Sequence, residues 1–146
     1  MMRMATVYRK EKHLYFHASS STTSGVWIAA PPFSMLPVDA SLEEKGGAVE
    51  GALEGSREEV DHPTDFRELI TPLLSLANVK SWATFSRKAR CCIVEMDDKN
   101  IAFIPHDNLG SREGFEARND MVTRLSVGAL SEEVGECLDR AFDACT

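Results

Sequence analysis

The chain has 146 residues, of which 43% are hydrophobic and 27% are charged, and its formal net charge is −7 at pH 7. Folding of a chain this long buries roughly two-thirds of its unfolded surface, so residues 1–146 are expected to form a single domain with an apolar core. No stretch approaches the ~20 apolar residues of a membrane helix, and the first residues lack the apolar region of a secretory signal. These features predict a cytoplasmic protein with no membrane contact.

The first 30 residues predict strands and a loop. Residues 5–9 and 12–18 alternate between apolar and polar side chains and are rich in aromatics, which is typical of strands. Residues 19–25 are polar and predict a loop. Residues 25–30 form a short apolar run, which predicts a buried strand. The two prolines that follow are expected to end it, because proline has no N–H to donate to a ladder.

A long helix is predicted to begin after Ser41. Glu44 lies three residues further on, which is the spacing of a capping box. The helix contains Gly46, Gly47 and Gly51, and an interior glycine costs about 0.5–1 kcal/mol relative to alanine. We therefore expect this helix to depend on tertiary packing, and we expect another element to lie close to its backbone.

The middle of the chain predicts a helical segment followed by strands. Apolar residues recur at helical spacing over residues 66–77, where Pro72 is expected to kink or split the helix. Three strand-like runs follow, and a tight turn joins the last two into a predicted hairpin. These runs cover residues 81–87, 90–96 and 101–105. The four cysteines are expected to be reduced core thiols, with the adjacent Cys91 and Cys92 on opposite faces of a strand.

Residues 107–120 have no sustained apolar period and predict a long surface loop. Long loops in compact domains are often functional, so this loop is a candidate contact region. A short strand over residues 121–127 and a regular amphipathic helix from Leu130 to Cys145 complete the chain. Runs of strands separated by helices predict an α+β fold, with a mostly antiparallel sheet packed with three helices.

One stretch of the sequence is repeated. LPVDASLEEKGGAVEGAL, residues 36–53, returns in altered form 89 residues later as LSVGALSEEVGECLDRAF. Both copies place a Glu-Glu pair at a helix start, where the helix dipole stabilises acids, so capping explains these pairs without catalysis. An internal duplication and chance convergence on one strand-to-helix solution both explain the match. In either case Gly46 and its counterpart Gly135 are expected to let each helix approach its neighbour.

Motifs that carry chemistry are almost absent. The sequence contains no glycine-rich phosphate loop, zinc-binding CxxC pair or hydrolase motif, which argues against an enzyme. Its cysteines and histidines do not cluster at ligand spacing, so no metal or other cofactor is expected. Glu95, Asp97 and Lys99 at the predicted hairpin resemble the arrangement with which metal-dependent nucleases hold magnesium. Tight turns also favour acids here, so a turn is preferred and a nuclease-like enzyme is the alternative.

Parts of the sequence resemble a known family. SGVWIAAPPF at 24–33 and LPVDASLEEKGGAVEGALEGSR at 36–57 are similar to the N-terminal half of immunity proteins from contact-dependent growth inhibition systems. The strand with Cys91 and Cys92, its hairpin and the helix beginning near Ser131 resemble the C-terminal part of that family. The resemblance implies a small cytoplasmic inhibitor that forms a heterodimer with the C-terminal toxin domain of a cognate adhesin. It implies no catalytic residues, and such toxins are commonly nucleases.

The contact residues are predicted from charge and loops. An acidic surface repels nucleic acid but fits the basic surface with which a nuclease binds phosphates. Such a surface can inhibit the toxin by covering its active site, which requires no catalytic residues in the inhibitor. Two acidic groups are therefore candidate toxin-binding sites. The first group is Glu50, Glu54, Glu58, Glu59 and Asp61, and the second is Asp107, Glu113, Glu116 and Asp120. A structural adaptor subunit, whose charge serves only solubility, is a further alternative.

Overall fold

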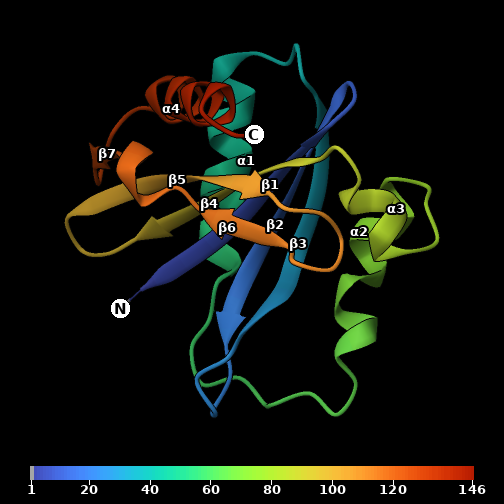
Figure 1. Cartoon of the computed structure of the whole chain (residues 1–146). Helices are drawn as coiled ribbons and strands as arrows, with labels where there is room; N and C mark the ends of the chain where they lie inside the picture. The colour runs from blue at the N-terminus through green and yellow to red at the C-terminus, as the bar shows by residue number, and fades with distance from the viewer. Residues whose placement is uncertain (1) are drawn as a thin grey trace.

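The computed structural model describes residues 2–146, which form a seven-stranded antiparallel sheet in the order β3-β2-β1-β4-β5-β6, with β7 pairing with β5 (Figure 1). The strands are β1 (Arg3–Lys10), β2 (His13–Ser21), β3 (Trp27–Pro37), β4 (Arg90–Met96), β5 (Asn100–Asn108), β6 (Phe115–Ala117) and β7 (Thr123–Ser126). The helices are α1 (Leu42–Gly55), α2 (Thr71–Leu76), α3 (Trp82–Ser86) and α4 (Ser131–Asp143), with the 3-10 helices η1 (Phe66–Ile70) and η2 (Asn119–Met121). The predicted α+β fold is confirmed, but it has four α-helices instead of three. No described helix is long and apolar enough to cross a membrane.

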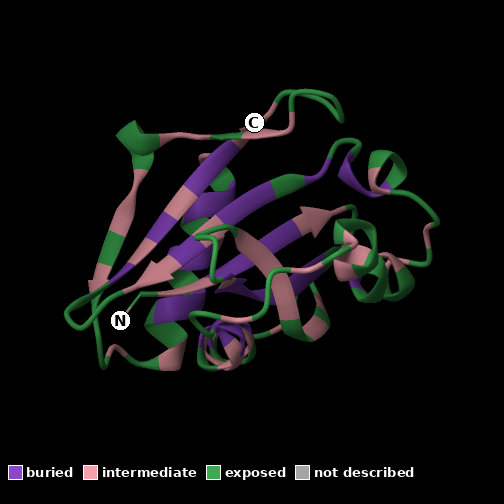
Figure 2. Ribbon diagram, turned by 90° about the horizontal axis from the view of Figure 1, so that it is seen from below, coloured by how far each residue is buried: buried purple, intermediate pink, exposed green. Residues whose placement is uncertain are grey.

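The helices give the sheet two separate cores. α1 and α4 pack on one face, and α2 and α3 lie over the other (Figure 1). Because successive strand residues face opposite sides, Cys92 lies in the core under α1 and α4, and Cys91 lies in the core under α2 and α3. All four cysteines are buried free thiols, as predicted. Figure 2 shows that the buried residues follow the central strands.

Aromatic rings dominate the core under α3. The ring of Phe85 lies 5.3 Å from those of Tyr8 and Tyr15, nearly perpendicular to both. The prediction of a strand over residues 81–87 is therefore wrong, because α3 brings this ring down onto the sheet. Ser81 caps the helix by accepting the N–H of the residue three positions on at 3.1 Å. A five-residue helix is too short for its apolar period to distinguish it from a strand.

The prolines of β3 do not end the strand, contrary to the prediction. Ala18 of β2 pairs with Ala30, and the next pair along the ladder skips both Pro31 and Pro32. The two prolines therefore occupy a bulge in an edge strand, where no ladder hydrogen bond needs their missing N–H. The edge position also explains why the apolar run at the start of β3 is half-buried instead of buried.

Two predicted loops contain strands. β2 continues through Ser19 and Ser20, which are buried, because the segment after α1 satisfies their polar groups. Ser20 Oγ, for example, accepts the N–H of Arg57 at 3.0 Å. The loop predicted over residues 107–120 contains the end of β5, all of β6 and the start of η2. The strand predicted over residues 121–127 is shortened to β7.

α1 and α4 touch at two glycines. A Cβ atom on Gly46 would lie 1.8 Å from the carbonyl oxygen of Ser131, and a Cβ atom on Gly135 would lie 2.0 Å from that of Leu42. The expectation that these glycines let each helix approach its neighbour is therefore confirmed. Gly46 corresponds to Gly135 in the sequence repeat, and Leu42 corresponds to Ser131. The contact is thus reciprocal, as it is across a two-fold axis.

The same relation extends through the sheet. Each half of the chain contains three antiparallel strands followed by a helix, β1-β2-β3-α1 and β4-β5-β7-α4, and the halves meet where β1 pairs with β4. Corresponding residues pair in the same register: Val7 with Phe16 and Val94 with Phe103, and Leu14 with Leu36 and Ile101 with Leu125. The shared order and register favour an internal duplication over chance convergence. The segment with η1, α2 and α3, between α1 and β4, has no counterpart in the second half.

Candidate functional site

The first acidic group begins on α1 and continues along the segment that follows it. Glu50 is half-buried, and its two carboxylate oxygens lie 3.0 and 3.1 Å from Ser131 Oγ, which donates to them. Glu50 therefore ties α1 to α4. The other four acids are exposed, and no ion pair within residues 2–146 neutralises them: Glu54, Glu58, Glu59 and Asp61.

Residues 56–62 form a fixed strip, here called the acidic ribbon, beside the end of β2. Ser21 donates its backbone N–H to the carbonyl of Arg57 at 2.9 Å and accepts that of Val60 at 3.1 Å. Glu59 lies between these anchors with φ of 55°, the left-handed region, which directs the chain from one anchor to the next. Because its backbone is pinned to the sheet, the ribbon presents its carboxylates in a defined arrangement.

The second acidic group is partly neutralised. Asp107 on β5 lies directly opposite Glu116 on β6. Arg118 Nε lies 3.9 Å from Asp107 Oδ1, and Arg118 Nη2 lies 3.5 Å from Asp120 Oδ2. Glu113 is exposed in the turn before β6. This surface therefore carries mixed charge, whereas the acidic ribbon carries mainly negative charge.

The structure does not bring the two acidic groups together. Every neighbouring pair in the series β2-β1-β4-β5 is antiparallel, so β2 and β5 run in opposite directions. The acidic ribbon lies beside the end of β2, and the second group lies beside the end of β5. The two groups therefore occupy opposite ends of the sheet.

The alternative nuclease site lies at the turn between β4 and β5. Asp97 Oδ1 accepts the backbone N–H groups of Lys99 at 2.8 Å and Asn100 at 2.7 Å, so its predicted role in the turn is confirmed. Glu95 lies one strand position away from that turn, opposite Ala102 of β5. Within residues 2–146, no group of three or more His, Cys, Asp or Glu side chains is placed to hold a metal ion. The geometry thus assigns Asp97 to folding.

The Asp97 carboxylate should make stability depend on pH. The backbone N–H groups of Asn100 and Lys99 stabilise its charged form and lower the pKa of Asp97. A folded-state pKa below the unfolded value of about 3.9 gives stability that is present above that value and is lost as the pH falls through the folded pKa. We expect Asp97→Asn to lower Tm at pH 7. As the pH is lowered from 7 to 2, the Tm of this variant should fall less than that of the unchanged protein, as measured by thermal denaturation.

Glu113→Gln is the matched control for this variant, because it neutralises an exposed acid in a different turn. Its Tm profile should overlay that of the unchanged protein. A Tm profile of Asp97→Asn that also overlays it would contradict the assigned turn role.

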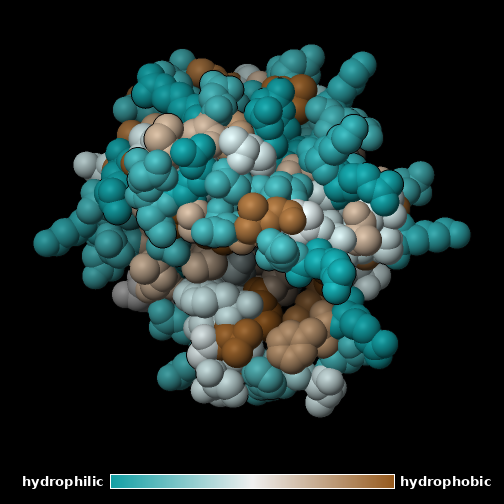
Figure 3. All heavy atoms as spheres, viewed as in Figure 1, coloured by the Kyte–Doolittle hydropathy of each residue, from teal (hydrophilic) through white to brown (hydrophobic). Residues whose placement is uncertain are grey.

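The second face of the sheet carries a groove that the sequence did not predict. Its volume is ≈ 390 Å³, and Figure 3 shows hydrophobic side chains around a hollow on this side of the molecule. The walls are half-buried and apolar, and the floor is buried and polar: Trp27, Ile28, Ile70 and Trp82 above Thr6, His17 and Ser19. Burial lowers the pKa of His17, so the floor is uncharged at pH 7. The one signal of this groove in the sequence was the apolar run at the start of β3, which was predicted to be a buried strand.

Charged surfaces and an apolar groove on a rigid α+β scaffold define a domain suited to binding another protein. The particular family follows from the sequence as a whole. The family model of the CDI immunity protein, CdiI, matches residues 3–145, so the chain belongs to this family. No curated protein matches the chain.

Two solved structures share the fold over the whole chain. A protein of unknown function from Neisseria meningitidis is 19% identical, with a TM-score of 0.83 and coverage of 100% of this chain and 96% of that one. A CdiA-CT/CdiI toxin and immunity complex from Yersinia pseudotuberculosis contains a chain that is 16% identical, with a TM-score of 0.83 and coverage of 100% and 98%. At 16% and 19% identity these similarities show the fold alone, and the assignment of the chain to the CDI immunity protein family rests on the family model.

Proposed function

We propose that this chain is a cytoplasmic immunity protein that binds the C-terminal toxin domain of a cognate contact-dependent growth inhibition adhesin and occludes its active site. The toxin is a nuclease, and the complex is a heterodimer. Membership of the CDI immunity protein family supports the immunity role. The similar Yersinia pseudotuberculosis structure is that of a toxin and immunity complex, which supports a toxin as the partner.

The acidic ribbon is the observation that carries this proposal. A nuclease presents basic side chains to the phosphates of its substrate, so an inhibitor that covers its active site must present negative charge. Glu54 at the end of α1 and Glu58, Glu59 and Asp61 on the ribbon are exposed, and no ion pair within the described chain holds them. We therefore place the toxin's basic groove on these four residues, and we assign Glu50 to the α1–α4 contact.

The second acidic group is the weaker candidate for this contact. Arg118 neutralises part of its charge. An electrostatic contact gains most where charge is uncompensated and where the backbone that carries it is already ordered. The ribbon meets the second condition, because its backbone is pinned to Ser21. It comes closer to the first, because its three carboxylates outnumber its one cation, Arg57, and within the described chain only one of them has a hydrogen-bond partner: Glu58 accepts the backbone N–H of Met2 at 3.2 Å.

A comparison of matched charge reversals tests the proposal. The triple variant Glu58→Lys, Glu59→Lys and Asp61→Lys should slow association with the toxin domain by at least about tenfold at low salt, because steering depends on the sign of the surface charge. The triple variant Glu113→Lys, Glu116→Lys and Asp120→Lys makes the same change of charge at the other end of the sheet, where Arg118 already neutralises part of the charge, and should slow association less than the first variant does. Stopped-flow kinetics at several salt concentrations measure both.

A larger effect from the second triple variant would contradict the acidic ribbon as the main contact and would assign that role to the β5 end of the sheet. The immunity role itself has a separate test in co-expression with the toxin domain encoded beside this chain. Neither a complex nor rescue of growth by the unchanged protein would overturn the proposal.

A further inference from the structure

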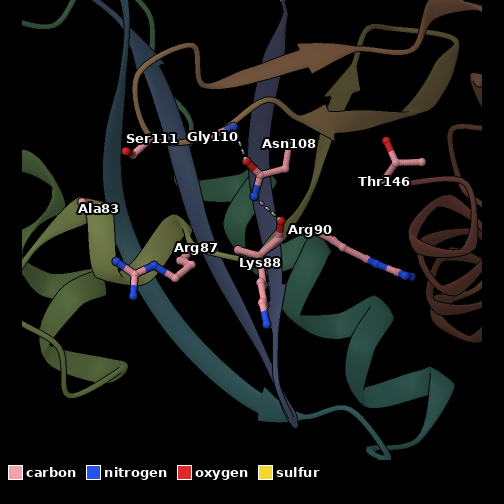
Figure 4. A pocket seen from close by; sticks show the side chains of 9 residues that line it. Ala83, Arg87, Lys88, Arg90, Asn108, Gly110, Ser111 and Thr146 are labelled. Atoms are coloured by element: carbon pink, nitrogen blue, oxygen red, sulfur yellow. Dashed lines mark hydrogen bonds between the residues drawn. The ribbon is translucent and has the colours of Figure 1, made fainter.

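The end of the sheet opposite the acidic ribbon carries a basic pocket of ≈ 500 Å³ (Figure 4). It lies between the turn that links α3 to β4 and the turn between β5 and β6. Arg87, Lys88 and Arg90 line it, and their exposed side chains leave one short stretch of backbone in different directions (Figure 4). None of the three belongs to an ion pair among residues 2–146, although the chain as a whole carries a net charge of −7.

Asn108 holds the two walls of the basic pocket together. Its Nδ2 donates to the carbonyl oxygens of Ser86 and Ala89, both at 2.8 Å, and its Oδ1 accepts the N–H of Gly110 at 3.0 Å. From the other side, Lys10 Nζ donates to the carbonyl oxygens at the end of α3. Asn108 and Lys10 therefore donate hydrogen bonds to the carbonyl groups of this turn, which would otherwise make it electronegative. Arg87 and Lys88 are left facing solvent from this ordered frame, whereas Arg90 Nη1 donates to the carbonyl oxygen of Phe142 at 3.2 Å.

Lys88 occupies a position that suits glycine better. Its φ is 59°, in the left-handed region that residues with a Cβ atom rarely adopt. No hydrogen bond within the described chain uses its ammonium group to hold the turn, so the fold gains little from a lysine side chain here. A charged residue at an unfavourable φ beside a pocket points to a role in binding.

We propose that the basic pocket receives a carboxylate-bearing segment of the toxin domain, as a second contact that fixes the orientation of the toxin on the acidic ribbon. This inference rests on the proposed function. β2 has nine residues and spans about 30 Å, which is close to the diameter of a domain of about 100 residues, so one toxin domain can reach both ends of the sheet. The groove adjoins the basic pocket, since Trp82 lines the groove and the next residue, Ala83, lines the pocket. It also reaches Ser19, two residues before Ser21, to which the ribbon is pinned.

A protein carboxylate fits this pocket better than a nucleic acid does. A nucleic acid carries a phosphate at every step of its backbone, and the acids that surround the pocket would repel its extended length. Glu11 lies at the adjoining hairpin, and Asp107 precedes Asn108 on β5. One or two carboxylates on a folded partner can enter the pocket without approaching these residues.

Lys88→Gly separates binding from folding. We expect it to weaken the affinity for the toxin domain by about tenfold while Tm is unchanged or raised, because glycine accepts φ of 59° without strain. Lys88→Gln should weaken the affinity to a similar degree. Lys99→Gln is the matched control in the hairpin at the other end of the sheet and should leave the Kd within about twofold. Isothermal titration calorimetry gives each Kd.

Other outcomes lead to distinct conclusions. A toxin domain that binds the unchanged protein and both Lys88 variants equally well would overturn this inference and leave the immunity role standing. Absence of toxin binding by the unchanged protein would overturn both. An NMR titration with inorganic phosphate provides a second check. Saturable shifts of the Arg87 and Lys88 amides at low millimolar phosphate, with toxin affinity unaffected by Lys88→Gly, would identify a phosphate site and overturn the proposed carboxylate contact.

Discussion

Gly46→Ala and Gly135→Ala should each lower the free energy of unfolding by about 3 kcal/mol, the upper range for overpacking a close contact. The added Cβ atom would lie 1.8 Å from the carbonyl oxygen of Ser131 in the first variant and 2.0 Å from that of Leu42 in the second. Both neighbours are backbone atoms, so no side chain can rotate to make room. The helices must separate and lose part of the core that they share with the sheet. Urea denaturation followed by circular dichroism measures the loss.

Gly47→Ala is the matched control, because it places the same substitution one residue further along α1. Apart from the backbone of α1 itself, no described atom lies within 4 Å of a Cβ atom built at Gly47, so alanine should raise stability by about 0.5–1 kcal/mol through its better helix propensity. The double variant Gly46→Ala and Gly135→Ala should cost less than the sum of its parts, since helices separated by the first substitution partly accommodate the second. Equal stability of Gly46→Ala and Gly47→Ala would contradict the close helix contact.

The sequence predicted α1 and α4 well because their signals are local. Ser41 Oγ accepts the N–H of Glu44 at 3.1 Å, and Glu44 Oε1 accepts the N–H of Ser41 at 3.3 Å, as the capping-box spacing requires. At the start of α4, Glu133 Oε1 likewise accepts the N–H of Leu130 at 3.1 Å. The repeat also predicted the glycine contact, because a glycine retained at the same place in two helices has a shared physical reason.

The sequence predicted α3 and β3 less well because tertiary context decides them. The run at 81–87 is short enough to be a strand or a helix, and the ring of Phe85 settles the choice by packing on Tyr8 and Tyr15. Pro31 and Pro32 continue β3 because a bulge removes the need for their N–H groups. Neither the bulge nor the edge position is visible from residue order alone.

The candidate site shows the limit of counting charges along a chain. Glu50 and Glu54 look equivalent in the sequence, but Ser131, 81 positions away, holds Glu50 between the helices. Asp107 and Asp120 look like free acids until β6 brings Arg118 beside them. Composition therefore identified an acidic protein, and only the fold distinguishes the charges available to a partner from those that other residues already hold.

Phe85→Ala should lower the free energy of unfolding by about 3–5 kcal/mol, the usual range for removing a buried aromatic ring. Phe85 is fully buried, and its ring contacts those of Tyr8, Tyr15 and Trp82. The core under α3 contains few other large buried side chains, so little remains to hold α3 after the substitution. Hydrogen exchange should therefore accelerate more in residues 82–90 than in α1 and α4, which pack on the other face.

Phe66→Ala is the control for this prediction, because Phe66 is 47% exposed and its removal should change stability by no more than about 0.5 kcal/mol. Among the described residues, the two cores lie on opposite faces of the sheet. A local effect of Phe85→Ala would therefore show that the segment with α2 and α3 opens as a unit of its own. That segment carries Arg87 and Lys88, and its loosening should weaken toxin affinity before the main core unfolds. Equal acceleration of exchange in α1, α3 and α4 would instead show one cooperative unit, in which the basic pocket depends on the whole fold.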